Sequence, residues 1–228
     1  MCFTPAISFS TAIIEFFTAI IILVFFKKSR VNLFFTIFLF ALGFYQISEF
    51  MLCTSLYPML WAKAGFIIYT LLPAMGLYST LRIIDRDYKS HKLALLYAPA
   101  VFFILTAVLN ENFIVYASCN EFFVEVGSML YDSSFLFAAY LAYYFGFLIL
   151  ICIFLYLAII KEKNKIKKKI EIAILVAVII TLLPAIVLIL IFPSLNKMFP
   201  SIYCEFAILF AITALISAYL DRKPRKRY

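Results

Sequence analysis

Three glutamates, Glu15, Glu49 and Glu205, lie inside long apolar stretches of this chain. A charged side chain at the centre of a bilayer costs about 2.5 kcal/mol by insertion measurements and roughly 10 kcal/mol or more by simulation. Carboxylates kept at such positions usually face the interior of a helix bundle, where they can bind a cation, an amine or a proton. These three residues are therefore the first candidates for a functional site.

Other polar residues recur beside these glutamates at helical spacing. Ser8, Thr11, Glu15 and Thr18 are three or four residues apart, which places them on one face of a helix. The predicted ligand-binding residues are Glu15, Gln46, Glu49 and Glu205, with Tyr45, Trp61 and Tyr203 as aromatic walls.

Three interpretations of these carboxyl groups stay open on the sequence alone. They could bind a small molecule or cation, relay ions or protons along a transport path, or hydrogen-bond to neighbouring helices and hold the bundle together. A Glu49→Gln variant that loses activity but keeps normal expression would exclude the purely structural interpretation.

The elements that must position these residues are long apolar helices. Hydrophobic residues make up 66% of the 228 residues and charged residues only 14%, whereas a soluble domain is about 25% charged. A helix needs ~20 apolar residues to cross ~30 Å of hydrocarbon. We therefore expect an all-α, polytopic membrane protein with one seven-transmembrane helix bundle, residues 1–220. The predicted spans are residues 5–26, 31–52, 59–82, 92–109, 135–160, 169–192 and 201–220.

Basic residues predict the orientation of these spans. Eighteen of the 20 Lys and Arg residues fall in alternate gaps or in the tail, residues 221–228, and the two exceptions are Lys63 and Lys197. Short loops rich in Lys and Arg stay cytoplasmic, which places the N-terminus outside and the C-terminus in the cytoplasm of a bacterium, with multiple passes through its inner membrane. The net charge of +8 then faces anionic membrane lipid, and no nucleic-acid partner is expected.

The long outer connection, residues 110–134, contains two β-prone runs at residues 113–116 and 122–126. They predict either a hairpin over the outer mouth of the bundle or an irregular interfacial loop. Pro73, Pro99 and Pro184 fall inside predicted spans and favour kinks there.

Four of the five cysteines are expected near the outer face, where an oxidising environment permits disulfides. Four cysteines allow three pairings, and free thiols are an equal alternative. A Cys2–Cys204 pair is attractive because the first and seventh spans should be neighbours. The four outer cysteines are Cys2, Cys53, Cys119 and Cys204.

The residue types present argue against several enzyme classes. His91 is the only histidine, so a zinc hydrolase site with several His ligands is not expected. Five glycines leave no phosphate-binding loop. We expect no catalytic residues and no cofactor, and the sequence assigns no metal.

Short motifs in the second and third spans resemble the seven-helix sensor region at the N-terminus of bacterial histidine kinases. Ala-Leu-Gly-Phe-Tyr-Gln-Ile-Ser-Glu at residues 41–49 is followed by Trp-Ala-Lys-Ala-Gly at residues 61–65 and by Pro73. Val-Glu-Val-Gly at residues 124–127 and Leu-Pro at residues 183–184 continue the resemblance. The resemblance implies ligand sensing near Glu49.

The chain departs from that sensor family in two ways. The sensor regions continue into signalling domains, whereas this chain stops at Tyr228, and Lys197 to Pro200 replaces an acidic residue before the last span. The start Met-Cys-Phe-Thr also resembles an uncharacterised group of stand-alone bacterial multispan proteins that begin Met-Cys-Phe-Ser. We therefore expect a stand-alone, receptor-like sensor that signals through a separate cytoplasmic protein, with a small transporter or proton-coupled carrier as the alternative.

Overall fold

The computed structural model describes residues 4–84, 95–119, 124–131, 133–191 and 207–222. The described residues form seven α-helices and one β-hairpin, so the prediction of a mostly helical protein is confirmed. Each helix overlaps one predicted span, and most of the ends agree to within a few residues. The helices are α1 (Thr4–Phe25), α2 (Arg30–Thr54), α3 (Pro58–Ile84), α5 (Ala98–Leu109), α6 (Ser134–Lys161), α7 (Lys165–Ile191) and α9 (Ala207–Asp221).

Four of these helices, α1, α2, α3 and α6, are long and apolar enough to cross a membrane. Helix α1 turns its polar residues toward the bundle and large apolar residues outward. Its polar residues Ser8, Thr11, Glu15 and Thr18 are at most 6% exposed, whereas Phe17 on the opposite face is 66% exposed. The predicted inward-facing stripe of α1 is therefore confirmed, and this distribution is what a lipid solvent requires.

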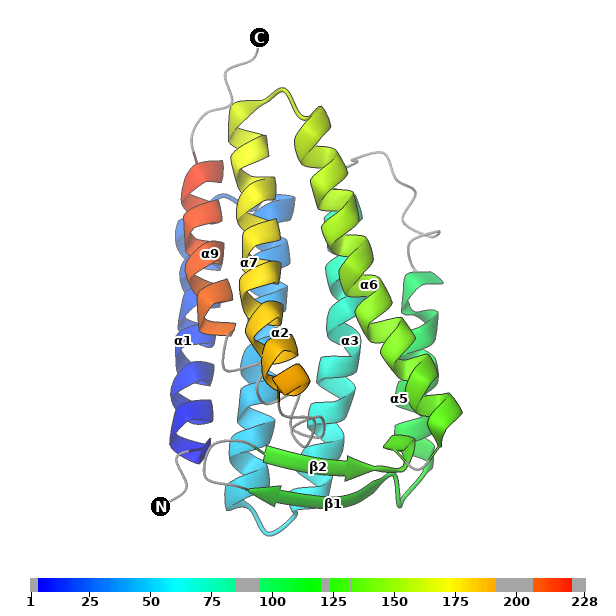
Figure 1. Ribbon diagram of the computed structural model, residues 1–228. Helices are drawn as coiled ribbons and strands as arrows, with labels where there is room; N and C mark the ends of the chain where they lie inside the picture. The colour runs from blue at the N-terminus through cyan, green and yellow to red at the C-terminus, as the bar shows by residue number, and fades with distance from the viewer. Residues whose placement is uncertain (1–3, 85–94, 120–123, 132, 192–206, 223–228) are drawn as a thin grey trace.

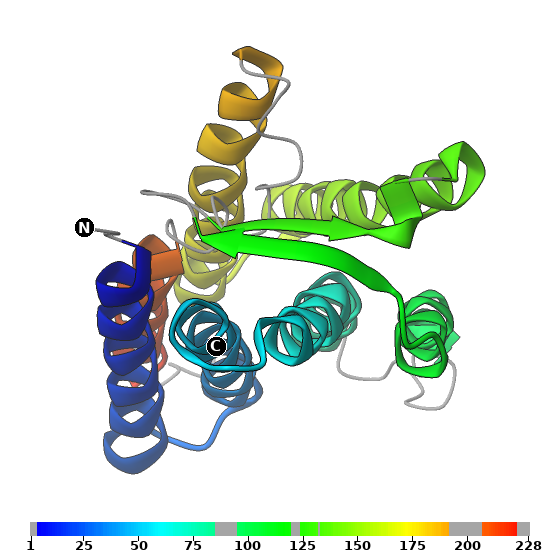
Figure 2. The same cartoon turned by 90° about the horizontal axis from the view of Figure 1, so that it is seen from below.

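Figure 1 shows the helices standing side by side, with the hairpin across one end of the bundle and the α1–α2 and α6–α7 connections at the other. Helix α1 packs against α2 and α9, α2 packs against α3, and α3 packs against α5 and α6. The view from the hairpin end shows its two strands lying across the bundle, between the α2–α3 pair and the α6–α7 pair (Figure 2). We call the hairpin end the outer end and the opposite end the inner end.

Side chains at the helix starts explain several boundaries. The N–H of Asn32 donates to the Ser29 hydroxyl at 3.2 Å, which caps the start of α2. Before α7, the side-chain oxygen of Asn164 accepts from the N–H of Ile166 at 3.0 Å. Short polar residues thus end each loop and satisfy N–H groups that the first helical turn leaves unpaired.

The prolines act differently from one another. Pro73 lies inside α3, as predicted. The prediction that Pro99 interrupts a span is wrong, because Pro99 occupies the first turn of α5. The N–H that proline lacks has no helical acceptor at that position, so Pro99 starts a helix and does not break one. A short 3-10 turn, Leu95–Tyr97, leads directly into it.

The outer connection folds as the hairpin alternative predicted. Strands β1 (Ile114–Cys119) and β2 (Val124–Ser128) pair antiparallel. A disulfide joins Cys119 at the end of β1 to Cys53 near the end of α2. The hairpin is therefore held to the helix that carries Glu49.

Candidate functional site

The described residues bring three of the four predicted polar ligands together between α1 and α2. Glu15 and Gln46 are fully buried, and Glu49 is 4% exposed. Ser8 from the first turns of α1 joins them through a hydrogen bond described below. We call Ser8, Glu15, Gln46 and Glu49 the α1–α2 polar cluster.

Glu49 is held by two hydroxyl groups. The Tyr45 hydroxyl, one turn earlier on α2, donates to Oε1 at 2.8 Å. The Ser8 hydroxyl on α1 donates to Oε2 at 3.3 Å. Glu49 therefore links two helices as a hydrogen-bond acceptor at the outer end of the bundle.

Glu15 and Gln46 differ from Glu49 in their bonding. Both oxygens of Glu15, and both the oxygen and nitrogen of the Gln46 amide, are buried without a hydrogen-bond partner among the described residues. Buried polar groups in folded proteins are nearly always hydrogen-bonded, and leaving one unpaired costs about 1–3 kcal/mol or more when it is charged. The described residues thus leave the hydrogen-bonding groups of Glu15 and Gln46 unused.

Glu15 lies on the same buried face of α1 as Ser8, which bonds Glu49 of α2. Glu15 follows Ser8 by seven residues, so it lies ~10 Å further from the outer end along α1. The cluster thus runs inward from Glu49 toward Glu15. Two like charges this near in a low-dielectric interior would repel strongly, and a bound cation or proton would relieve that repulsion.

A group of tyrosines continues from Glu49 across the bundle. The Tyr45 ring meets Tyr69 at a centroid distance of 5.9 Å, and Tyr69 meets Tyr140 and Tyr144 at 6.4 and 6.3 Å. The Tyr140 hydroxyl lies 3.0 Å from the Thr70 hydroxyl. Aromatic faces attract cations, so this group provides a second kind of surface that suits positive charge.

The same region shows how α3 tolerates Pro73. Proline cannot donate a hydrogen bond to the carbonyl one turn earlier, which disturbs the helix at that turn. The Tyr143 hydroxyl of α6 donates to the Thr70 carbonyl at 2.6 Å. This bond joins α6 to α3 beside the Tyr69 carbonyl, which is the carbonyl that Pro73 leaves without its helical donor.

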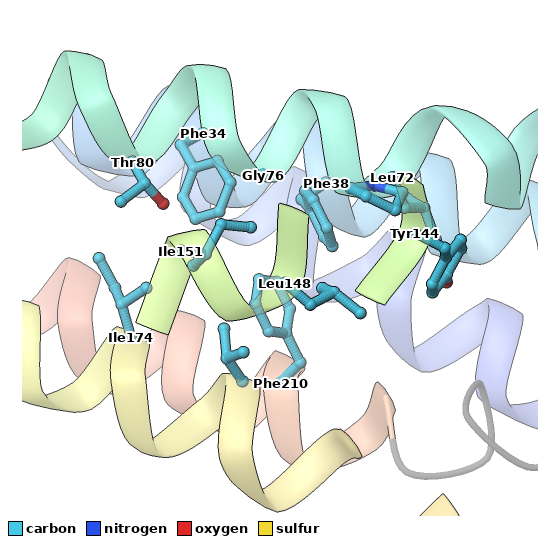
Figure 3. Close-up of a pocket in the computed structure, with 12 residues that line it drawn as sticks. Phe34, Phe38, Leu72, Gly76, Thr80, Tyr144, Leu148, Ile151, Ile174 and Phe210 are labelled. Carbon is cyan, nitrogen blue, oxygen red and sulfur yellow. The ribbon is translucent and has the colours of Figure 1, made fainter. Parts of the chain in front are cut away.

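A small cavity of about 30 Å³ lies where α2, α3, α6, α7 and α9 meet, on the inner side of the tyrosines (Figure 3). Its lining is apolar apart from the hydroxyls of Thr80 and Tyr144. Such a volume holds no more than about two water molecules. None of Glu15, Gln46 and Glu49 lines it, so it is not the site of a charged ligand.

Trp61 is placed apart from the polar cluster. It is half-buried and lines a larger groove of about 310 Å³ between α2 and α3. Tyr45 contacts the cluster through its hydroxyl, which donates to Glu49. The other predicted site residues, Glu205 and Tyr203, lie outside the described residues, as do Cys2 and Cys204 of the predicted disulfide.

One buried carboxyl group was missed. Glu171 in the first turns of α7 is fully buried, and Lys167 Nζ lies 3.6 Å from its Oε1. Glu171 follows a run of lysines, which made it resemble a solvated helix end. The spacing of four residues from Lys167 was the available signal, because it places both side chains on one face.

The described residues contain no group of three or more His, Cys, Asp or Glu that could hold a metal ion. The donor set of the α1–α2 polar cluster is two carboxyl groups, one amide and one serine hydroxyl. No protein-family model matches this chain, and no curated protein is significantly similar to it.

Proposed function

We propose that this chain is a receptor-like, seven-helix sensor of a bacterial cytoplasmic membrane, and that it binds a small positively charged molecule or cation at the α1–α2 polar cluster. The observation that carries the proposal is the bonding of Glu15. Its carboxyl group is fully buried with both oxygens unpaired in the described part of the chain. A carboxyl group that only joined helices would need hydrogen-bond donors, as Glu49 has.

The proposed orientation places the hairpin outside and the lysine-rich connections in the cytoplasm. Two separate arguments support it. Short basic loops are retained in the cytoplasm, and Lys27, Lys28 and the lysines that begin α7 share the inner end. The Cys53–Cys119 disulfide lies at the outer end, and disulfides persist in oxidising compartments. The ligand would then reach Glu49 first, from outside.

The proposed output is a separate signalling protein that docks at the basic inner end. The resemblance of residues 41–49 and 61–65 to histidine-kinase sensor regions supports sensing as the class of function. Helices α7 and α9 contact one another, and α7 runs from the inner end toward the hairpin (Figure 1). Ligand occupancy at the outer end could thus change helix packing at the inner end.

A thermal-shift screen of the purified chain in detergent tests this proposal. The probes are the chlorides of sodium, potassium, magnesium and calcium, a primary amine and a quaternary amine. Binding stabilises the folded state by about 2.7 kcal/mol when the ligand is at 100 times its Kd. We expect at least one cation to raise the Tm of the wild-type protein, and the rise to disappear in Glu15→Gln and Glu49→Gln at unchanged expression.

Glu111→Gln is the matched control, because Glu111 is exposed at the same outer end and lies outside the cluster. It should keep the full shift. A shift of equal size in Glu15→Gln, or no shift with any of these cations, would contradict the proposal.

A proton-coupled carrier is the second candidate. Glu15 lies ~10 Å further inward along α1 than Ser8, the residue that bonds Glu49. Carboxyl groups at successive depths can pass a proton from one to the next, and this arrangement favours a carrier. Uptake of a labelled amine into proteoliposomes, driven by a pH gradient and lost in Glu15→Gln, would favour the carrier over the sensor.

A further inference from the structure

The α2–α3 groove lies on the outside of the bundle and has no part in the α1–α2 polar cluster. Its volume is about 310 Å³. The residues that line it include Ala41, Phe44, Ser48, Trp61, Ala64 and Met75. Phe44 is 57% exposed, so the groove opens toward the surface that faces lipid.

Small side chains explain why there is a hollow here. Helices α2 and α3 approach closely at Gly65, where an added Cβ would lie 2.8 Å from the Ser48 hydroxyl. Beside this contact Ala41 and Ala64 leave space that larger residues would fill. The bulkier lining residues stand around that space, and the result is an elongated groove along the two helices.

The groove is apolar along almost its whole length. The Ser48 hydroxyl donates to the Tyr45 carbonyl at 2.6 Å, so it offers no donor to an occupant. The remaining side-chain N–H or O–H group in the lining is the indole of Trp61, in the first turn of α3. Met75 follows Trp61 by fourteen residues, which corresponds to ~21 Å along the helix. An occupant must therefore be apolar over that length, and the Trp61 indole at the outer end is the one lining side chain with a donor to offer it.

We propose that this groove seats one acyl chain of a phospholipid, with the ester and headgroup region of that lipid beside Trp61. Tryptophan favours the membrane interface, where its N–H meets polar groups and its ring meets hydrocarbon. One leaflet supplies about 15 Å of hydrocarbon, and the groove is long enough to take a chain of that length. The proposal is independent of the cation site.

Trp61 is the only tryptophan of the chain, so its fluorescence reports on the groove alone. The experiment titrates detergent-solubilised protein with a phospholipid brominated on one acyl chain, because bromine quenches indole fluorescence on contact. A seated lipid should quench most of the emission and saturate near one lipid per protein. Bromine near the ester end should quench more than bromine near the methyl end, since Trp61 lies at the outer end.

Ala41→Phe fills the inner part of the groove, ~15 Å from Trp61, and should abolish the saturable quenching without changing the emission of the lipid-free protein. Ala138→Phe is the matched control, because Ala138 is exposed on α6 and outside the groove. It should quench like the wild type.

The wild-type titration alone decides the matter if Ala41→Phe does not fold. Quenching that grows only in proportion to the bulk fraction of brominated lipid, without saturation, would overturn the proposal. So would a dimer that shields Trp61 from the brominated lipid, because the groove would then seat a second copy of this chain.

Discussion

Helices α1 and α7 each bury a carboxyl group completely, and the surroundings of the two groups differ. Glu15 in α1 and Glu171 in α7 are both 0% exposed. Lys167 Nζ lies 3.6 Å from Glu171 and 2.7 Å from Glu162. Glu15 has no ion pair among the described residues.

The two helices differ in the residue that precedes the buried glutamate by one helical turn. Lys167 precedes Glu171 by four residues on the same helix. Thr11 precedes Glu15 by the same four residues and is buried, with no charge to offer. At the inner end one lysine, Lys167, lies between Glu162 and Glu171 and offsets part of their charge. Glu15 has no such cation among the described residues, and the function proposed above assigns that role to a proton or a ligand.

The two ends also differ in how they are tied together. Lys167 donates to the Ile84 carbonyl at 3.4 Å, so the inner charge cluster joins α7 to the end of α3. The outer end is tied by the Cys53–Cys119 disulfide. A covalent tie holds the hairpin in place without using the carboxyl groups beneath it.

Removing the disulfide should have the largest effect on stability. The two cysteines are 66 residues apart, and a disulfide that closes a loop of this kind stabilises the folded state by about 2–4 kcal/mol. The low end is expected here, because helices that remain in a micelle already restrict the unfolded chain. The measurement is denaturant unfolding of Cys53→Ser/Cys119→Ser in detergent. Reductant should destabilise the wild type and the Cys152→Ser control more than the double variant, which already lacks the Cys53–Cys119 bond, and equal sensitivity of all three would contradict this.

Removing Lys167 should have the next largest effect. Lys167→Met leaves Glu171 buried without its cation, and an unpaired buried polar group costs about 1–3 kcal/mol. Adding Glu171→Gln removes the uncompensated charge and should recover part of that loss. Unfolding free energies of the two single variants and the double variant measure the coupling. Strictly additive losses would show that the pair does not act as a unit.

The sequence predicted the helices well because two strong forces determine them. Apolar length determines where a helix can cross a membrane, and polar spacing determines which face turns inward. Helix α1 illustrates both, since its ends and its buried stripe agree with the prediction. The β-prone runs in the long outer connection also predicted the hairpin, as one of two alternatives.

The remaining errors concern contacts between distant parts of the chain. Spacing alone left three cysteine pairings open, because which thiols meet depends on where the hairpin packs. Pro99 was misjudged because an apolar run does not reveal where its helix begins. Glu171 was missed because its burial depends on how α7 packs against the rest of the bundle.

Loss of one hydrogen bond at the outer cluster should have a moderate effect. Tyr45→Phe removes the donor to Glu49 Oε1 and keeps the ring that packs against Tyr69, so it should cost about 0.5–1.5 kcal/mol. If the cation proposal is right, it should also weaken the cation-induced shift in Tm without abolishing it. Tyr57→Phe is the control, because Tyr57 is 69% exposed. A Tyr45→Phe variant as stable as this control would show that the hydrogen bond contributes nothing.

The smallest effect is expected from the acid dependence of the inner cluster. Partial burial by itself raises the pKa of Glu162. Hydrogen bonds from Lys167 and from the Asn164 N–H, together with the positive charge of Lys167, outweigh that effect. The net result is a pKa below the ordinary value of 4.5. A carboxyl group with a lowered folded-state pKa stabilises the protein above its unfolded pKa, and this contribution is lost as the pH falls through the folded value. The pair is partly exposed, so the loss should be no more than about 1 kcal/mol.

The measurement is the unfolding free energy of the wild type and of Glu162→Gln between about pH 6 and pH 3, the range that brackets ordinary carboxyl titration. The wild type should lose its advantage over Glu162→Gln toward the acid end, because only the wild type has this carboxylate to protonate. Glu162→Gln does not alter the surroundings of Glu15, which lies near the middle of α1. A difference between the two proteins that stays constant over this range would mean that the Lys167–Glu162 pair adds no stability, and that Lys167 acts through Glu171 and Ile84 alone.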